Sequence, residues 1–337
     1  MDKFTRALDL IGNHFSGDIL INHSPANGYR SRCEFGYKNG FYTMYDSHGK
    51  RIELRSFAIA RPSIQNIMPK LIDCINDNHE LNNKLFQINF RTNRNDHLLI
   101  SLIYHKLLND NLKQKASELA DQLNIDINIR ARKELFSTGS ELLIDNISVS
   151  NSTLYQTDQS FYQPNHFHVP KMINKAIEYI DEPFDLLELY CGSGTFTLPL
   201  SSIFKNVFAT ESNRQSIKCI TKSISEQKIN NIKHARLSAE EISEAFNGRI
   251  FRRMAGISIT DYNFSHILVD PPRSGLGEDV IPLLKKFKNI IYISCNYETY
   301  IKDLKMLSDY KIANIEIFDQ FPNTPHLEVV SVIRKYN

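Results

Sequence analysis

The sequence predicts a two-domain α/β protein, with a parallel sheet in the C-terminal half and a smaller α+β domain before it. Two apolar runs, residues 267–269 and 290–293, stop abruptly at Asp270 and at a polar pair that ends in Cys295, as buried parallel strands do. A third apolar run, residues 185–191, leads through a Gly-Ser-Gly turn into a helix. The N-terminal half instead shows alternating aromatic strands and amphipathic helices. With 337 residues, the chain is long enough for two hydrophobic cores.

The composition is that of a globular protein without a membrane segment. The chain is 42% hydrophobic and 23% charged, and no apolar run approaches the roughly 20 residues that span a bilayer. The N-terminus lacks a signal-peptide core, so we expect a cytoplasmic protein. The five cysteines form no Cys-x-x-Cys pair, which argues against a disulfide framework, a zinc ribbon or an iron–sulfur cluster. The net charge of +2 does not identify a nucleic-acid binder, so any RNA surface must come from local clustering.

The first elements are a helix and a β-hairpin. Residues 3–14 have apolar positions at helical spacing, and residues 29–37 and 40–45 alternate as two aromatic strands around a Lys-Asn turn. Arg30 and Arg32 would share one face of the first strand, and arginines interleaved with tyrosines suit contact with RNA phosphates and bases. The alternative is an ordinary solvated face, which is what charged alternate positions usually mean.

Further helices and strands complete the N-terminal half. We expect helices at residues 62–78 and 113–123 and strands at residues 85–91, 98–105 and 125–131. This order predicts a compact α+β domain of about 150 residues, a common domain size. Arg130, Arg132 and Lys133 end the last strand and could bind phosphate, although cations at a strand end are more often simply solvated.

The composition becomes polar around residues 148–157, and we place the domain boundary there, between residues 1–155 and 156–337. An aromatic-rich turn at residues 160–165 and a helix at residues 169–180 follow. His166 and His168 lie between them, but they lack nearby partners of ligand type, so we expect no metal site.

The second half begins with the signature of an adenosine-containing cofactor. The strand, the Gly-x-Gly turn and a helix are followed by a strand at residues 206–210 that ends at Glu211, and an acid at that place suits a ribose diol. A dinucleotide site would have a third glycine where Thr197 stands. The turn therefore favours S-adenosylmethionine over a pyrophosphate cofactor.

The remaining elements continue the alternation of helices and strands. We expect helices at residues 212–229, after Ser238, and at 298–308, and strands at residues 232–237, 312–318 and 329–333. A terminal pair of strands is a usual ending for a methyltransferase sheet, which is an analogy at the level of the fold.

The chemistry is expected at the edge where the strands end. Because carboxyl ends of neighbouring parallel strands meet there, Asp270, Arg273 and Cys295 should lie together. A thiolate that adds to carbon-6 of uracil makes carbon-5 nucleophilic enough to take a methyl group, and a base must then remove the carbon-5 proton. A free thiol has a pKa near ~8.5, so it needs nearby positive charge, which Arg273 could supply. The alternative for Cys295 is a small buried core residue.

These segments resemble the tRNA uracil-5-methyltransferases, which make 5-methyluridine in the T-loop. The matching pieces are YRSRCEF, KLFQINF, SLIYHK, QPN, LLELYCGSGTF, ATE, DPPRSGL, YISCN and FDQFPNTPHLE, from about residue 29 to 328. DPPRSGL together with YISCN is the specific part, whereas QPN alone is not. Three positions depart from the family pattern, namely Thr195 where Asn is usual, Pro325 where His is usual and Val329 where Cys is common.

The resemblance implies a Rossmann-like S-adenosylmethionine methyltransferase domain behind an RNA-binding domain. It implies that Cys295 is the nucleophile, that Glu328 is the base and that Arg273 lies at the target uridine. The implied S-adenosylmethionine positions are Gln163, Tyr190, Thr195, Glu211 and Asp270. The N-terminal domain, with Arg30 and Arg32, would bind the T-loop of tRNA. We expect no membrane association and no stable protein partner.

Three other functions compete with this one. Ribosomal-RNA uracil-5-methyltransferases carry cluster-binding cysteines and often an N-terminal RNA-binding barrel, and this sequence shows neither. An RNA-folding factor in which methylation is secondary would show the same motifs. Methyltransferases of exocyclic amines also carry an Asp-Pro-Pro motif, but they need no thiol, so Arg273 and Cys295 argue against them.

Overall fold

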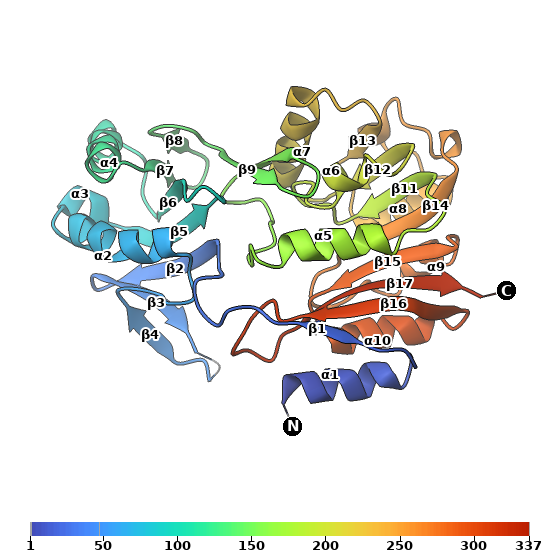
Figure 1. The fold of residues 1–337 in the computed structure, drawn as a ribbon. Coiled ribbons are helices and arrows are strands. Elements are labelled where there is room, and N and C mark those ends of the chain that lie inside the picture. The colour runs from blue at the N-terminus through green and yellow to red at the C-terminus, as the bar shows by residue number, and fades with distance from the viewer. Residues whose placement is uncertain (1, 47, 337) are drawn as a thin grey trace.

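The computed structural model of the chain describes residues 2–46 and 48–336, and it contains two large β-sheets that lie side by side (Figure 1). One sheet has eight strands and the other has seven, and a two-stranded ribbon lies in the segment between them. None of the helices in the described residues is long and apolar enough to cross a membrane.

The eight-stranded sheet has the order of a doubly wound α/β fold, β1-β16-β17-β15-β14-β11-β12-β13. Its parallel strands are β11 (Asp185–Leu189), β12 (Asn206–Thr210), β13 (Ile232–Ala235), β14 (Phe264–Val269) and β15 (Asn289–Ser294). β17 (Glu328–Lys335) is antiparallel to β15, and β16 (Tyr310–Phe318) is antiparallel to β17. The chain order reverses between β11 and β14, and ligands of such sheets bind at the carboxyl ends of the strands there.

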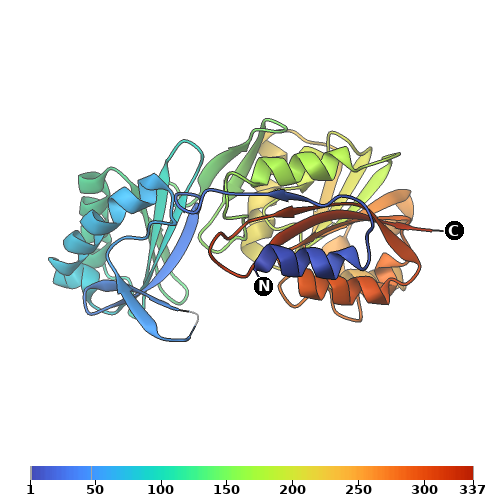
Figure 2. The same ribbon diagram turned by 60° about the horizontal axis from the view of Figure 1, so that its bottom comes forward.

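Helices cover both faces of this sheet (Figure 2). One face carries α5 (Val169–Glu178) and α6 (Thr197–Leu200), and α7 (Arg214–Glu226) lies beside them. The other face carries α1 (Lys3–Gly12), α8 (Ala239–Phe246), α9 (Ile281–Leu284) and α10 (Tyr297–Met306). Both faces are apolar because Leu187 and Leu189 point into one core while Leu186 points into the other. This explains why the sequences of the parallel strands are continuous apolar runs.

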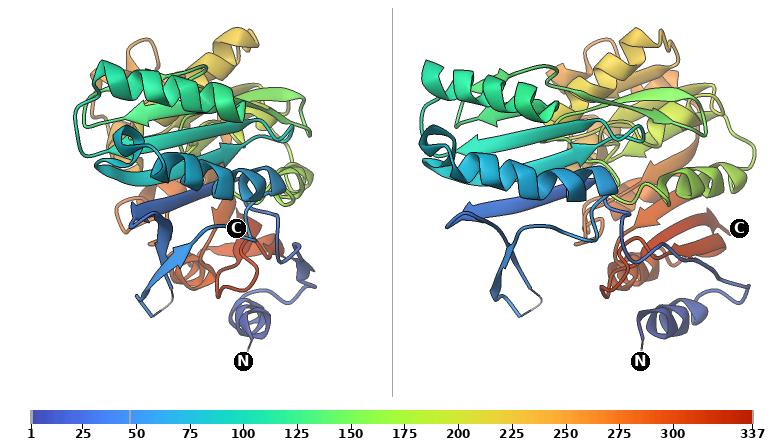
Figure 3. Two further views of the ribbon diagram at one scale, coloured as in Figure 1. Left: turned by 90° about the vertical axis from the view of Figure 1, so that its left-hand side faces the viewer. Right: turned by 60° about the vertical axis from the view of Figure 1, so that its left-hand side comes forward.

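The seven-stranded sheet has helices on one face (Figure 3). Its order is β4 (Arg51–Leu54), β3 (Phe41–Tyr45), β2 (Arg32–Lys38), β5 (Leu85–Thr92), β6 (Leu98–Tyr104), β7 (Asp126–Arg130) and β8 (Leu135–Ser137). Helices α2 (Pro62–Asn76) and α4 (Asp110–Leu123) pack on its apolar face, and α3 (His79–Asn82) joins α2 to β5. The hairpin, the two longer helices and the three strands expected from the sequence are confirmed.

The ribbon between the sheets was not expected. β9 (Leu143–Ile147) and β10 (Ser152–Gln156) pair in antiparallel fashion where the composition indicated only a polar boundary. β9 alternates buried and exposed residues, and Leu154 of β10 is buried. The ribbon is held to α7, because Gln227 Oε1 accepts a hydrogen bond from the Thr153 backbone N–H at 2.7 Å.

Residues 2–22 belong with the larger sheet, although the sequence predicts them in the N-terminal domain. β1 (Leu20–Asn22) pairs in parallel with β16, and α1 lies beside α10, where Arg6 pairs with Glu298 at 2.5 Å. The apolar stripe of α1 has the same spacing whichever core it covers, so periodicity does not reveal its partner. The division near residue 155 otherwise stays a prediction.

Candidate active site

A cavity of 630 Å³ opens at the carboxyl edge of the larger sheet, and the seven-stranded domain supplies part of its wall. The residues singled out from the sequence line it, Thr195 excepted, and they are Arg30, Arg32, Gln163, Tyr190, Glu211, Asp270, Arg273, Cys295 and Glu328. A volume of this size suits a small-molecule ligand, for which about 300–1,000 Å³ is usual.

The glycine turn after β11 is shaped by positive backbone angles. Gly192 and Gly194 have φ of 55° and 97°, and a Cβ on Gly194 would lie 3.1 Å from a side-chain carbon of Ile220. Tyr190, at the strand end, has a φ of 59° although it carries a side chain, and such strain is typical of functional sites. Thr195 is buried just after the turn and lies outside the set of described residues that line the cavity, so its cofactor contact stays a prediction.

Glu211 connects the glycine turn to the end of β12 through hydrogen bonds. Its Oε2 accepts a hydrogen bond from the Gly192 backbone N–H at 3.0 Å, and its Oε1 accepts one from Asn213 N–H at 2.7 Å. A carboxylate offers about four lone-pair positions, so this one keeps acceptor capacity for a ligand. The expected pairing of a glycine turn with an acid on the next strand is thus present in the structure.

A relay of side-chain amides supports Asp270. Gln163 Nε2 donates to Asp270 Oδ2 at 3.1 Å, and Gln320 Nε2 donates to Gln163 Oε1 at 2.8 Å. Asn165 Nδ2 donates to the backbone oxygen of Gln320 at 3.2 Å. The relay joins the QPN and FDQF segments, in which Gln163 and Gln320 are 157 residues apart. Sequence reasoning did not single out Gln320, because only the folded chain brings these segments together.

The carboxyl groups of Asp270 and Glu328 hold protons more tightly than ordinary carboxyl groups. Burial raises the pKa of Glu328, and the nearby Asp270 carboxyl raises it further, while Arg273 acts in the opposite direction. Burial also raises the pKa of Asp270, and the hydrogen bond from Gln163 partly offsets this. Two carboxyl groups that face one cavity disfavour each other's ionisation.

Cys295 lies at the end of β15, beside the turn that carries Arg273. Burial raises the pKa of its thiol to about 12, the carboxyl groups of Glu328 and Asp270 add to this, and Arg273 opposes it. The thiol is therefore protonated at neutral pH in the free protein and must lose its proton when substrate is present. Cys295 is only partly buried and lines the cavity, so the alternative of a core cysteine is wrong for this residue.

Arg30 and Arg32 lie on the wall that the N-terminal domain supplies. Arg32 donates two hydrogen bonds to Glu34 Oε1, at 2.8 and 2.5 Å, and the Arg30 guanidinium lies 5.8 Å from the centre of the Phe321 ring. Arg30 therefore contacts the loop that leads to Glu328. Both arginines line the cavity, and their contact with RNA stays a prediction.

Glu188 is a buried acid that sequence reasoning missed, because it reads as one position of an apolar strand. It lies on β11 with 1% exposure, and its Oε2 has no hydrogen-bond partner in the described part of the chain. Burial raises its pKa to about 8, and the charge of the nearby Asp270 carboxyl group raises it further. It therefore lies near Asp270, on the strand that leads into the glycine turn.

The raised pKa of Glu188 predicts a pH-dependent stability. The folded protein holds this proton up to about pH 8, whereas the reference pKa is 4.5, so stability falls as the pH rises between these values. Each pKa unit is worth about 1.4 kcal/mol, so the loss is on the order of several kcal/mol. We expect the stability of Glu188→Gln relative to the parent to increase from pH 5 to pH 9 in urea unfolding. A difference that stays constant with pH would contradict the assignment.

Comparisons with known proteins identify the family of the chain. The family model described as tRNA (Uracil-5-)-methyltransferase matches residues 2–336. The tRNA/tmRNA (uracil-C(5))-methyltransferase of Campylobacter curvus is 39% identical over 335 residues, which cover 97% of this chain and 92% of that protein. The protein of the same name from Saccharophagus degradans is 38% identical and covers 99% of this chain and 95% of its own length.

Among solved structures, the fold is shared with the Pyrococcus abyssi tRNA (uracil-54, C5)-methyltransferase in complex with S-adenosyl-L-homocysteine. The TM-score is 0.75 at 19% sequence identity, over 98% of this chain and 82% of that one. The match of the family model across the chain and the curated relatives decide the assignment: the chain belongs to the tRNA (uracil-5-)-methyltransferase family.

Proposed function

We propose that the protein methylates carbon-5 of a T-loop uridine in tRNA, with S-adenosylmethionine as donor, and that it acts in the cytoplasm. The observation that carries the proposal is the cavity in which Cys295, Arg273 and Glu328 meet Asp270 and Glu211. The names of the curated relatives, tRNA/tmRNA (uracil-C(5))-methyltransferase, support the same substrate and the same atom.

The cofactor would be held by Tyr190, Glu211, Gln163 and Asp270. When bound, S-adenosylmethionine supplies an electrophilic methyl group. The fit rests on the acids beside the glycine turn, because Glu211 retains acceptor capacity for a ribose and Asp270 offers a second carboxyl group in the same cavity. The glycine turn lets the backbone approach a ligand closely.

The reaction on the base would run through Cys295. Its thiolate sulfur bonds to carbon-6 of the uracil, and the electrons of the carbon-5–carbon-6 double bond move toward oxygen-4, where the positive charge of Arg273 favours the developing anion. The electron pair on carbon-5 would then bond to the methyl carbon of the donor, whose bond to sulfur would break and leave a neutral thioether. Glu328 removes the proton from carbon-5, the electron pair of that bond re-forms the double bond, and the carbon-6–sulfur bond breaks to release the thiolate.

A T-loop uridine must leave its stacked position before this chemistry can occur, which costs a few kcal/mol. Part of the compensation can come from a base elsewhere in the same tRNA, because an exposed ring pair lies at the end of the N-terminal sheet away from the active site. Phe86 is 49% exposed, and its ring stacks on His105 at 4.1 Å with an angle of 17°. An exposed ring pair offers a platform for a base, worth about 1–3 kcal/mol. Neither residue stood out from the sequence, because an exposed aromatic on a strand is not a signal by itself.

The direct test is a mass map of the product. Unmodified tRNA transcript is incubated with the protein and with S-adenosylmethionine that carries a deuterated methyl group, and its nuclease fragments are analysed by mass spectrometry. We expect 5-methyluridine with the label in the T-loop. A transcript with cytidine at the target position serves as control and should stay unlabelled. Label in another nucleoside, or none at all, would contradict the proposal.

A further inference from the structure

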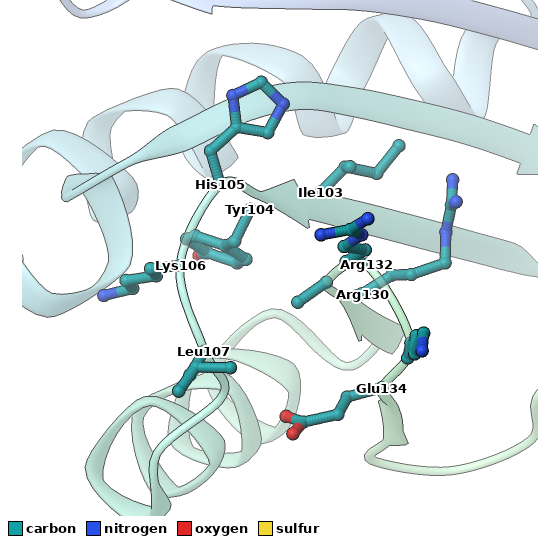
Figure 4. Close-up of a pocket in the computed structure, with 10 residues that line it drawn as sticks. Ile103, Tyr104, His105, Lys106, Leu107, Arg130, Arg132 and Glu134 are labelled. Atoms are coloured by element: carbon teal, nitrogen blue, oxygen red, sulfur yellow. The ribbon is translucent and has the colours of Figure 1, made fainter.

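A second cavity, of 920 Å³, lies at the far end of the seven-stranded sheet (Figure 4). Two segments form it, residues 103–107 at the end of β6 and residues 130–134 at the end of β7. The opposite end of β6 faces the two-stranded ribbon, because Asn93, in the β5–β6 turn, donates to the backbone oxygen of Ile144 in β9 at 2.7 Å. The active-site side is also at that end, because Arg91, which pairs with Leu99 of β6, donates to the backbone oxygen of Asp158 at 3.2 Å. The two cavities share none of their lining residues within the described chain.

The walls of this cavity carry uncompensated positive charge. Lys106 is paired with Glu80 at 2.7 Å, and Arg130 is paired with Asp158 at 2.9 Å. Arg132 and Lys133 are exposed and have no ion-pair partner among the described residues. The acid on the wall, Glu134, accepts a hydrogen bond from the Leu108 backbone N–H at 3.3 Å. Figure 4 shows that the cationic side chains come from both segments.

The surroundings of these cations favour a nucleic acid over an acidic peptide. Leu107 is 79% exposed on the wall, and His105 on the rim stacks on the half-exposed Phe86. Cations beside a stacked pair of rings match a ligand that carries both phosphates and flat bases. Unpaired arginine and lysine side chains next to each other suit the phosphate backbone, which carries no sequence information.

We propose that this cavity binds the sugar–phosphate backbone of the tRNA outside the loop that enters the active site. The inference rests on the proposed function. β6 has seven residues, so at about 3.3 Å per residue roughly 20 Å of strand separates the two ends of the sheet. A flipped uridine in the active site therefore cannot also fill this cavity, and a different part of the same RNA must reach it. Arg132 and Lys133 would each contact a phosphate.

Charge reversal at these two positions tests the proposal. In Arg132→Glu/Lys133→Glu we expect KM for full-length tRNA to rise about tenfold or more at physiological salt, and the slope of log affinity against log salt to fall by about two. The kcat at saturating tRNA should stay within a factor of about two, because neither residue touches the chemistry. Methylation of a short hairpin that carries only the target loop and three closing base pairs should be unchanged.

The matched control is Lys302→Glu/Lys305→Glu, which reverses two exposed cations of α10 in the other domain. It should leave KM, the salt slope and hairpin methylation at parental values, and melting curves of both variants should match the parent. An unchanged KM for tRNA in Arg132→Glu/Lys133→Glu contradicts the proposal. Equal losses on tRNA and hairpin contradict it too, since the contact would then lie within the loop. Methylation of the hairpin by the parent protein tests the proposed function by itself, so failure of this proposal can be distinguished from failure of the proposed function.

Gln320 carries a second, independent inference. An amide side chain has one donor end and one acceptor end, and Gln320 Nε2 occupies the acceptor end of Gln163 at 2.8 Å. The donor end of Gln163 is then left to face Asp270. Gln163 and Gln320 are 3% and 0% exposed, so water does not replace either bond. We infer that Gln320 is a positioning residue, which fixes the orientation of the Gln163 amide and through it the carboxyl group of Asp270 toward S-adenosylmethionine.

Binding of S-adenosylmethionine without RNA, measured by calorimetry, tests this role. Gln320→Glu offers Gln163 an acceptor in place of a donor, so the amide turns and Asp270 loses its partner. We expect Kd to rise roughly tenfold, the loss of one hydrogen bond to a charged group. Gln320→Met removes the polar end at similar volume and should raise Kd less. In a Gln163→Met background, Gln320→Glu should add nothing, because the two residues act as one unit. Unchanged Kd in both single variants, or additive effects in the double variant, would contradict the inference.

Discussion

Replacement of Cys295 by alanine is expected to abolish methylation of tRNA, by roughly 10⁴-fold or more. Carbon-5 of uracil is a poor nucleophile, and in the described structure Cys295 is the one thiol that lines the active-site cavity. Without its sulfur, no bond to carbon-6 makes carbon-5 electron-rich. Binding of S-adenosylmethionine and of tRNA should stay near parental values, because the glycine turn and the N-terminal domain are untouched. The measurements are the initial rate of methyl transfer and the two binding constants.

Cys74 provides the matched control. Its thiol is also partly exposed, but it lies on α2 and outside the set of described residues that line the cavity. Cys74→Ala should methylate tRNA at the parental rate. If Cys295→Ala retained substantial activity, the methyl group would reach carbon-5 without a covalent adduct. In cells, Cys295→Ala also separates methylation from any folding effect on tRNA, because only the chemistry is removed.

The second large effect is expected for Glu328→Gln, whose turnover should fall by roughly 10²- to 10⁴-fold. The carbon–sulfur bond breaks only after the carbon-5 proton has left, and an amide is a poor acceptor for that proton. Glu328 lines the cavity with Cys295 and is 1% exposed, so water cannot easily replace it. The variant should therefore accumulate a covalent adduct with ordinary tRNA, visible as a shifted band on a denaturing gel.

The pH dependence of adduct breakdown checks the same assignment. Burial and the neighbouring Asp270 raise the pKa of Glu328, and a base acts only when it is ionised. In the parent, breakdown in a single turnover should therefore speed up as pH rises and level off above that pKa. Glu328→Gln should show no such rise, and Glu226→Gln, an exposed glutamate of α7, should behave as the parent. Parental turnover in Glu328→Gln without adduct would assign the base elsewhere.

The sequence was sufficient to predict where the chemistry lies. The apolar runs before Asp270 and Cys295 identify β14 and β15, and parallel strands bring their carboxyl ends to one edge. Glu211 could be placed beside the glycine turn for the same reason, since β11 and β12 are neighbours. These residues follow from local pattern and one topological rule. Glu328, the first residue of β17, was placed by family resemblance, and its distance from Cys295 along the chain carries no geometric signal.

Contacts between distant segments could not be predicted. Gln320 supports Asp270 only through Gln163, and neither periodicity nor spacing encodes a hydrogen bond between two loops. Helix α1 was assigned to the wrong neighbour, because an amphipathic stripe specifies that a helix is covered but not by which core. Glu188 was overlooked because a single acid in an apolar strand resembles a tolerated exception until its burial is known.

Covalent trapping with tRNA that contains 5-fluorouridine at the target position tests the central claim most directly. Fluorine cannot leave carbon-5 as a proton does, so the adduct formed through Cys295 should persist after methyl transfer and survive denaturation. We predict a stable protein–RNA species whose peptide map places the bond on Cys295. Cys74→Ala should form this species, and Cys295→Ala should not. A lack of adduct, or an adduct that Cys295→Ala still forms, would contradict the account.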